Sequence, residues 1–359
     1  MDSVTQRAEL LVGAGKPDSW LIDPKRDAND LKPEAAALRR ILLEPDIGEI
    51  VAAFHACDAA AGRAQRSYKR LARIAAWTGF GAALIGSLVL MLIHLQPPAI
   101  VTTAAAAAQA IMLLVSLGTS LIIGSKRPFE AWMLKRADAE NARGTLFDRI
   151  MAAREPRAPD AVPLLALQLE YLRRHLLDVE RNYYRERGEQ HAAAARAAWW
   201  WRLIAFVLIA VAAFPLIWTI QGATWLPAPI AGLVSHMPDR SEEAQRVFLG
   251  LGIIAASLQG LLASFAVMSL DDRNAARYRT TADNLDALAG PPLAEARAAA
   301  ASTATDGEAA ERAREQVLAF VALVQSQISS EHREWIALRK VAPDLALDRL
   351  KSLRLPPRA

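Results

Sequence analysis

Three short groups of residues could support chemistry, and each lacks a necessary part. Gly13-Ala-Gly-Lys16 is similar to the end of a phosphate-binding loop. That motif needs a glycine where this chain has Leu10, and a serine or threonine where it has Pro17. We therefore interpret the glycines as part of a turn.

The remaining polar groups do not form a metal or catalytic set. His55 and Cys57 are two candidate ligands without partners nearby, and Cys57 is the single cysteine of the chain. Asp271 and Asp272 stand beside Arg273, so we interpret them as solvated charges at a membrane boundary. The sequence leads us to expect no catalytic residues, no metal, no cofactor and no enzymatic activity.

Two glutamines lie in strongly apolar surroundings. Gln259 is at the middle of residues 247–270, a run of 24 residues without a charge, and Gln109 lies in another such run. A glutamine in hydrocarbon needs a polar partner, so it should face protein or water. Either an interhelical hydrogen bond or a place in the lining of a pore would satisfy it.

Small residues form a smooth stripe beside Gln259. Gly252, Ala256, Gly260 and Ser264 recur at intervals of four residues, which places them on one side of a helix. Such stripes let helix backbones approach closely in lipid. The stripe predicts packing either within a hairpin or between subunits around a central path.

The elements that hold these residues are long apolar segments. A helix of 24 residues is about 36 Å long, and the hydrocarbon core of a bilayer is about 30 Å thick. Residues 74–95, 99–124 and 199–220 are similar in length and character to 247–270. A soluble core helix of this length would show a polar stripe. We predict four transmembrane helices in an all-α membrane protein, arranged as two hairpins with long cytoplasmic helices.

The positions of lysine and arginine predict the topology. Residues 1–73 contain 12 of them, residues 126–202 contain 15 and residues 271–359 contain 13. Arg240 and Arg246 alone lie between the third and fourth spans. Because basic residues stay cytoplasmic, both termini should be cytoplasmic. The net charge of +4 is small, and basic stretches next to spans suggest lipid headgroups rather than nucleic acid.

The chain divides into four segments. Residues 1–48 are polar and should form short helices and loose chain. Residues 49–160 should be a first two-span hairpin, residues 161–342 a second one with a C-terminal helix, and residues 343–359 a tail. The shared layout of the two hairpins predicts an internal duplication. We expect a linker from about Gly290 to Gly307.

The C-terminal half resembles the SLATT family of bacterial two-transmembrane effector domains. The resemblance is in Tyr183-Tyr184-Arg185, in Arg277-Tyr278-Arg279 and in Glu331-His-Arg-Glu-Trp335. Residues 50–160 look like a divergent second copy. The resemblance implies a membrane effector of defence systems in the bacterial inner membrane. Such effectors are proposed to form pores when a sensor module is triggered.

We therefore expect an oligomeric, pore-forming or membrane-perturbing effector with a separately encoded sensor as partner. Candidate pore-lining or helix-packing residues are Gln109, Gly252, Ala256, Gln259, Gly260 and Ser264. Candidate contacts of the cytoplasmic helices are Tyr184, Glu331 and Trp335. The alternative is a non-conducting scaffold that recruits a partner through an apolar stripe on residues 317–338.

Overall fold

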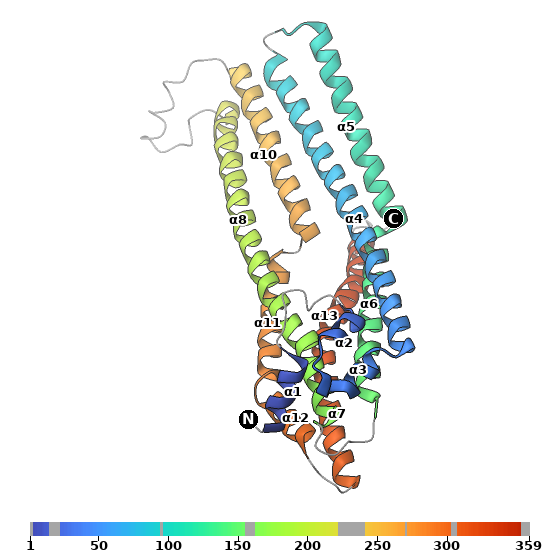
Figure 1. Ribbon diagram of the computed structural model, residues 1–359. Helices are drawn as coiled ribbons and strands as arrows, with labels where there is room; N and C mark the ends of the chain where they lie inside the picture. Colours follow the sequence, from blue (N-terminus) through green and yellow to red (C-terminus); the bar gives the residue numbers. More distant parts are fainter. Residues whose placement is uncertain are drawn as a thin grey trace, which may run out of the picture. The chain divides into compact units, whose positions relative to one another are not determined.

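The computed structural model describes a helical protein (Figure 1). The described residues are 3–13, 22–93, 96–154, 162–221, 241–269, 271–302 and 307–352, and among them no strand occurs. The structure does not describe the side chains of residues 214–221, 241–245, 267–269, 271–272 and 330–352. The last range includes Glu331 and Trp335, two of the predicted contact residues.

The described helices follow one another with short connections. In chain order they are α1 (Ser3–Val12), α2 (Pro24–Asp30), the 3-10 turn η1 (Pro33–Ala35), α3 (Ala36–Leu42), α4 (Pro45–Leu92), α5 (Ala99–Lys126), α6 (Pro128–Ala152), α7 (Leu164–Leu172), the π-helix η3 (Arg173–Leu177), α8 (Asp178–Gln221), α10 (Ser241–Ser269), α11 (Asp271–Leu288), α12 (Pro291–Ala301) and α13 (Gly307–Ser352).

The chain folds into two compact units, each built from several segments. Unit 1 comprises Met1–Arg63, Glu130–Gln190 and Asn274–Ala359, and unit 2 comprises Ala64–Phe129 and His191–Arg273. Each unit therefore takes residues from both predicted hairpins. The boundaries of the four predicted segments stay a prediction, and so does the duplication.

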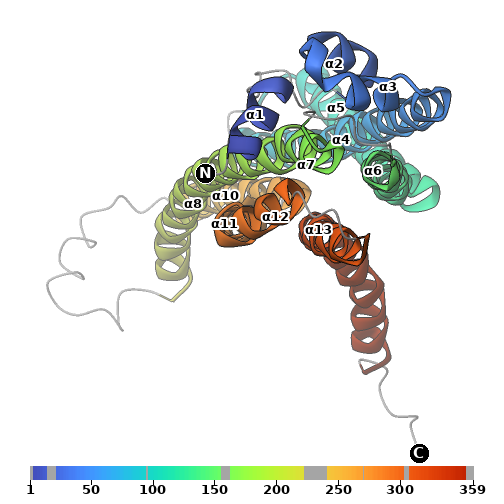
Figure 2. The ribbon, with the colours of Figure 1, turned by 60° about the horizontal axis from the view of Figure 1, so that its bottom comes forward.

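Helix α7 is the centre of unit 1. All residues from Ala166 to Leu172 are buried, so the helix is covered on every side rather than on one stripe. Helices α1, α3 and α12 contact it (Figure 2). The core continues to α6 through Phe147 and Ile150, and to α13 through Phe320 and Val324.

The described part of the first 48 residues belongs to this core. Ala8, Leu38, Ile41 and Leu42 are each at most 1% exposed. Asp23 caps α2, because its side chain accepts a hydrogen bond from the backbone N–H of Arg26. Our expectation of short helices is confirmed for the described part, whereas the expectation of loose chain is wrong there.

The predicted linker after Gly290 is also wrong in its first part. Residues 291–301 form α12, in which Leu293, Ala296, Ala300 and Ala301 are buried. Proline is tolerated in the first turn of a helix, where its missing N–H is not needed, and the alanines that follow favour helix. The composition that suggested a linker is therefore that of a short core helix.

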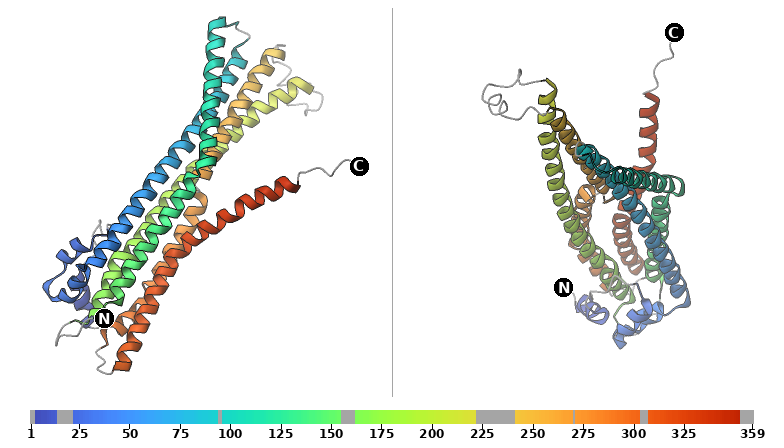
Figure 3. Two further views of the ribbon diagram at one scale, coloured as in Figure 1. Left: turned by 90° about the vertical axis from the view of Figure 1, so that its right-hand side faces the viewer. Right: turned by 90° about the horizontal axis from the view of Figure 1, so that it is seen from above.

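Unit 2 contains the apolar parts of the long helices, which run side by side (Figure 3). Four helical stretches are long and apolar enough to cross a membrane, namely Pro45–Leu92, Ala99–Lys126, Leu164–Ala213 and Arg246–Ala266. Large apolar side chains such as Ile100, Leu114 and Phe206 are more than 60% exposed, as expected of lipid-facing positions. The prediction of an all-α membrane protein with four spans is confirmed. The hairpin arrangement, the cytoplasmic helices and the outer segment at 222–240, which lies outside the described residues, stay predictions.

Candidate functional site

Helices α4 and α5 meet along a seam of glycines. A Cβ added at Gly86 would lie 2.5 Å from Nε2 of Gln109, and one at Gly81 would lie 2.9 Å from Sδ of Met112. Near the other end, the Ser116 hydroxyl donates a 2.9 Å hydrogen bond to the carbonyl oxygen of Ala75. The glycines let α5 side chains lie directly on the α4 backbone. Gln109 thus packs against the neighbouring helix of its own chain.

Helix α4 also contacts α10, within the same unit. A side chain at Gly250 would overlap Met91 and approach the backbone oxygen of Ser87. Further along, the rings of Trp77 and Phe265 have centroids 5.9 Å apart. Helix α4 is therefore packed between α5 and α10.

The predicted stripe on α10 divides between two environments. Gly252 faces α8, because a Cβ added there would lie 4.0 Å from that of Ala212. Ala256, Gly260 and Ser264 are exposed instead, and a Cβ at Gly260 would meet nothing within 4 Å. The four residues therefore do not act together within the chain, and three of them leave a smooth face uncovered.

Gln259 lies at the edge of that face. The side chain is half-buried, and its Oε1 atom is buried without a hydrogen-bond partner among the described residues. An unpaired amide oxygen in apolar surroundings is costly. If Gln259 served only in helix packing, its Oε1 atom should accept a hydrogen bond from another helix of the chain. The described residues do not supply that hydrogen bond. The roles of Gln259 and Gln109 stay predictions.

Tyr184 joins two stretches that the sequence analysis treated separately. It is 4% exposed in unit 1, and its ring lies edge-on to Tyr278 of α11 at 5.4 Å. On the same pair of helices, Arg181 and Arg185 both bind the carboxylate of Asp286. The predicted contact at Tyr184 is therefore one between α8 and α11.

Unit 1 holds a buried polar cluster that the sequence analysis missed. The Tyr171 hydroxyl donates a 2.9 Å hydrogen bond to Asp27, and Nδ1 of His175 lies 3.6 Å from the same carboxylate. Burial raises the pKa of Asp27, and burial next to Asp27 raises the pKa of Tyr171 well above its usual value. Asp27 lies in a short polar helix and Tyr171 is 144 residues away, so no local spacing could have indicated the pair.

The π-helix η3 fastens the first helix to the core. Arg173 binds Glu170 and Glu9, and the Arg174 guanidinium donates to the carbonyl oxygen of Val12. Glu170 is 1% exposed and is also held by Arg297 from α12. A buried carboxylate with two guanidinium partners is satisfied rather than free to react.

The groups that could have supported chemistry are structural where they are described. Gly13 has φ +82° and ends α1 in a turn, with its N–H donating to the carbonyl oxygen of Glu9. The His55 ring bonds the carbonyl oxygen of Ile22 at 3.0 Å, and Cys57 is half-buried. Lys16, Asp271 and Asp272 lie outside the described side chains. In the part of the chain searched, no group of three potential ligands is placed to hold a metal ion.

Comparison with known proteins gives one match. Searches of curated proteins and of solved structures found none. Residues 52–199 match the family described as SMODS and SLOG-associating 2TM effector domain 3. The match covers α5, α6, α7, most of α4 and the first half of α8, so it lies mainly on the first hairpin. The sequence analysis placed the resemblance on the C-terminal half and a divergent second copy on residues 50–160. Most of the match lies on that second copy, and Tyr183-Tyr184-Arg185 also falls inside it. Over residues 52–199, the chain is therefore similar to the SLATT family of two-transmembrane effector domains.

Proposed function

We propose that this protein is an oligomeric effector of a bacterial defence system, which permeabilises the inner membrane when a separately encoded sensor triggers it. The family match implies a membrane effector in a conflict or defence setting and supports this proposal. Pore formation, oligomerisation and triggering are the parts that we propose beyond that.

The uncovered face of α10 is the observation that supports an oligomer. The glycines of α4 are used inside the chain, because Gln109 and Met112 pack on them. Ala256, Gly260 and Ser264 have no such partner among the described residues. In lipid, helices associate through close packing of small residues, so a second copy of α10 fits this face.

A path through the oligomer would then pass Gln259. The half-buried amide lies beside the uncovered face, and its buried Oε1 atom has no hydrogen-bond partner in the described part of the chain. Polar side chains at membrane depth are stable where they face water or a neighbouring subunit. Opening would be a shift between two packings of the α10 helices.

The trigger would act on unit 1, which we place on the cytoplasmic side. The family description names SMODS and SLOG modules as associates, and we infer that a module of that kind is the partner. The basic residues that flank the spans favour this orientation.

The alternative is a non-conducting scaffold that uses the apolar stripe of α13. Val317, Phe320, Val321, Val324 and Ile328 of this stripe are all buried in the core of unit 1. The described part of the stripe is therefore not available to a partner, which favours the effector over the scaffold.

Cysteine cross-linking tests the oligomer without a trigger. In a Cys57→Ser background, Gly260→Cys should give a disulfide-linked dimer in membranes, since bonded cysteines need Cα atoms within about 7 Å. Gly118→Cys is the matched control, because Gly118 is a glycine of α5 that also has open space around it. Equal cross-linking at the two positions, or none at Gly260, would contradict the proposed interface.

Membrane depolarisation tests the pore. Cells that express the chain together with its sensor should lose the potential measured with a voltage-sensitive dye. Gly260→Leu and Gln259→Leu should abolish the loss at equal membrane levels, whereas Gly118→Leu should not. If Gln259→Leu and Gly260→Leu both depolarise cells as wild type does, the path does not run along this face.

A further inference from the structure

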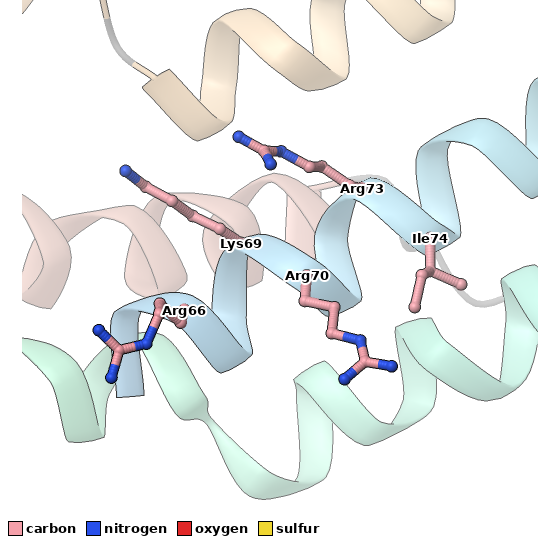
Figure 4. Close-up of a pocket in the computed structure, with 5 residues that line it drawn as sticks. All are labelled: Arg66, Lys69, Arg70, Arg73 and Ile74. Carbon is pink, nitrogen blue, oxygen red and sulfur yellow. The ribbon is translucent and has the colours of Figure 1, made fainter. Parts of the chain in front are cut away.

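Four cations form one face of α4 just before its apolar part. Arg66, Lys69, Arg70 and Arg73 stand at spacings of three and four residues, so they lie together over two turns of the helix. Ile74 follows at once and begins the apolar run. Figure 4 shows the four side chains extending from this stretch of α4.

No acidic group neutralises this cluster within the described part of the chain. None of its four members makes an ion pair there, whereas Arg136, Arg143, Arg173 and Arg297 of unit 1 each bind a carboxylate. Four like charges within two turns repel one another. The arrangement becomes favourable when an anion lies between them.

The surroundings of the cluster are those expected at a membrane surface. The Tyr68 ring packs edge-on against Phe129 at 5.2 Å, so the end of α5, with Lys126, is level with the cluster. Trp77 follows one turn after the cluster and is 55% exposed. Tryptophan is typical of the interface between headgroups and hydrocarbon.

A hollow accompanies the charges. Its volume is about 320 Å³, and Arg66, Lys69, Arg70, Arg73 and Ile74 line it (Figure 4). This is the space of about ten water molecules. The residues that line it are four cations and the apolar Ile74, a combination that suits a molecule with a phosphate and a hydrocarbon part.

We propose that this hollow binds the headgroup of an anionic phospholipid. The phosphate accepts hydrogen bonds from Lys69 and Arg73, whose side chains extend to the same side of α4 (Figure 4). Arg66 and Arg70 add charge, and the acyl chains continue along the apolar surface beyond Ile74. Guanidinium groups bind phosphate through paired N–H donors. A nucleic acid has no acyl chain to place there, so a lipid fits the boundary better. This inference does not depend on conductance or on a sensor.

The experiment measures lipid binding to the full chain in a non-ionic detergent. Phosphatidylglycerol is titrated and bound lipid is counted by native mass spectrometry, with phosphatidylcholine in a parallel titration. The test variant changes Arg66, Lys69, Arg70 and Arg73 to glutamine. Each cation near the surface strengthens binding about fivefold, so the variant should bind phosphatidylglycerol at least a hundredfold more weakly.

Two further variants separate charge at this place from charge in general. Arg7→Gln, Lys25→Gln, Lys32→Gln and Arg279→Gln together remove four exposed cations of unit 1 and should bind lipid as wild type does. Changing the three cluster arginines to lysine keeps the charge and should retain most of the binding, which guards against simple misfolding of the glutamine variant.

Three results would overturn the proposal. In the first, the wild type and the glutamine variant bind phosphatidylglycerol equally well. In the second, the wild type binds phosphatidylcholine as well as it binds phosphatidylglycerol. Displacement of the lipid by millimolar inorganic phosphate, with phosphate alone binding as tightly as the lipid does, would assign the site to a free anion instead.

Discussion

The hydroxyl of Tyr171 gives the sharpest test of how unit 1 holds its N-terminal helices. Tyr171 is 2% exposed and donates a 2.9 Å hydrogen bond to Asp27, which is 4% exposed. Tyr171→Phe removes this hydroxyl and keeps the ring, whose centroid lies 4.4 Å from that of His175. The variant therefore changes one hydrogen bond and leaves the packing in place.

The magnitude follows from the charge of the acceptor. A hydrogen bond to a charged group contributes about 1.5–3 kcal/mol, and one between neutral groups about 0.5–1.5 kcal/mol. Local opening of α2 should then be roughly 10- to 150-fold more frequent in the variant when Asp27 is ionised. Hydrogen exchange of residues 24–30, followed by mass spectrometry, measures this opening.

The pH dependence has a definite sign. The folded pKa of Asp27 lies above its ordinary value of 3.8, mainly because burial disfavours the charge. The folded state thus holds the proton more tightly, so the contribution of Asp27 to stability is greatest below pH 3.8 and falls as the pH rises through the folded pKa. The effect of Tyr171→Phe should grow over the same window, and Asp27→Asn should remove the slope.

The refuting result is equally definite. If residues 24–30 exchange at the wild-type rate in Tyr171→Phe, the hydrogen bond does not hold α2 in place. Tyr183→Phe is the control, because Tyr183 is 41% exposed and its ring contacts Tyr184 and Tyr278 rather than α2. It should leave exchange of α2 unchanged.

Two further substitutions test the two units separately. Arg143→Leu leaves Glu180 buried without its partner, so the free energy of unfolding should fall by about 3–5 kcal/mol. A lower melting temperature of the detergent-purified protein would report this loss. Adding Glu180→Leu should restore much of the loss; no restoration would count against charge burial as the cause. Gly86→Leu places a side chain where Gln109 lies, so it should cost about 1–3 kcal/mol, while Gly118→Leu should be tolerated in the same melting assay. Equal melting temperatures for the two glycine variants would mean that the α4–α5 seam is looser than described.

The sequence by itself determined the class of protein. Long uncharged runs such as 247–270 can form nothing but a membrane-spanning or fully buried helix, because backbone groups in lipid must bond within their own segment. The length of each uncharged run can be read directly from the sequence, so the number of consecutive uncharged residues was enough to identify the spans. The family resemblance was also readable from short motifs, and the match lies mostly on the segment that we interpreted as a divergent second copy.

Tertiary structure decided which polar and small residues act together. Gly252 and Gly260 belong to one sequence pattern, yet one faces α8 and the other meets nothing within 4 Å. Local spacing gives the side of a helix but not the helix that covers it. The same holds for Asp27 and Tyr171, whose pairing depends on how unit 1 assembles from distant segments. Burial by a distant segment is also what raised the pKa of Asp27 and turned a polar stretch into part of the core.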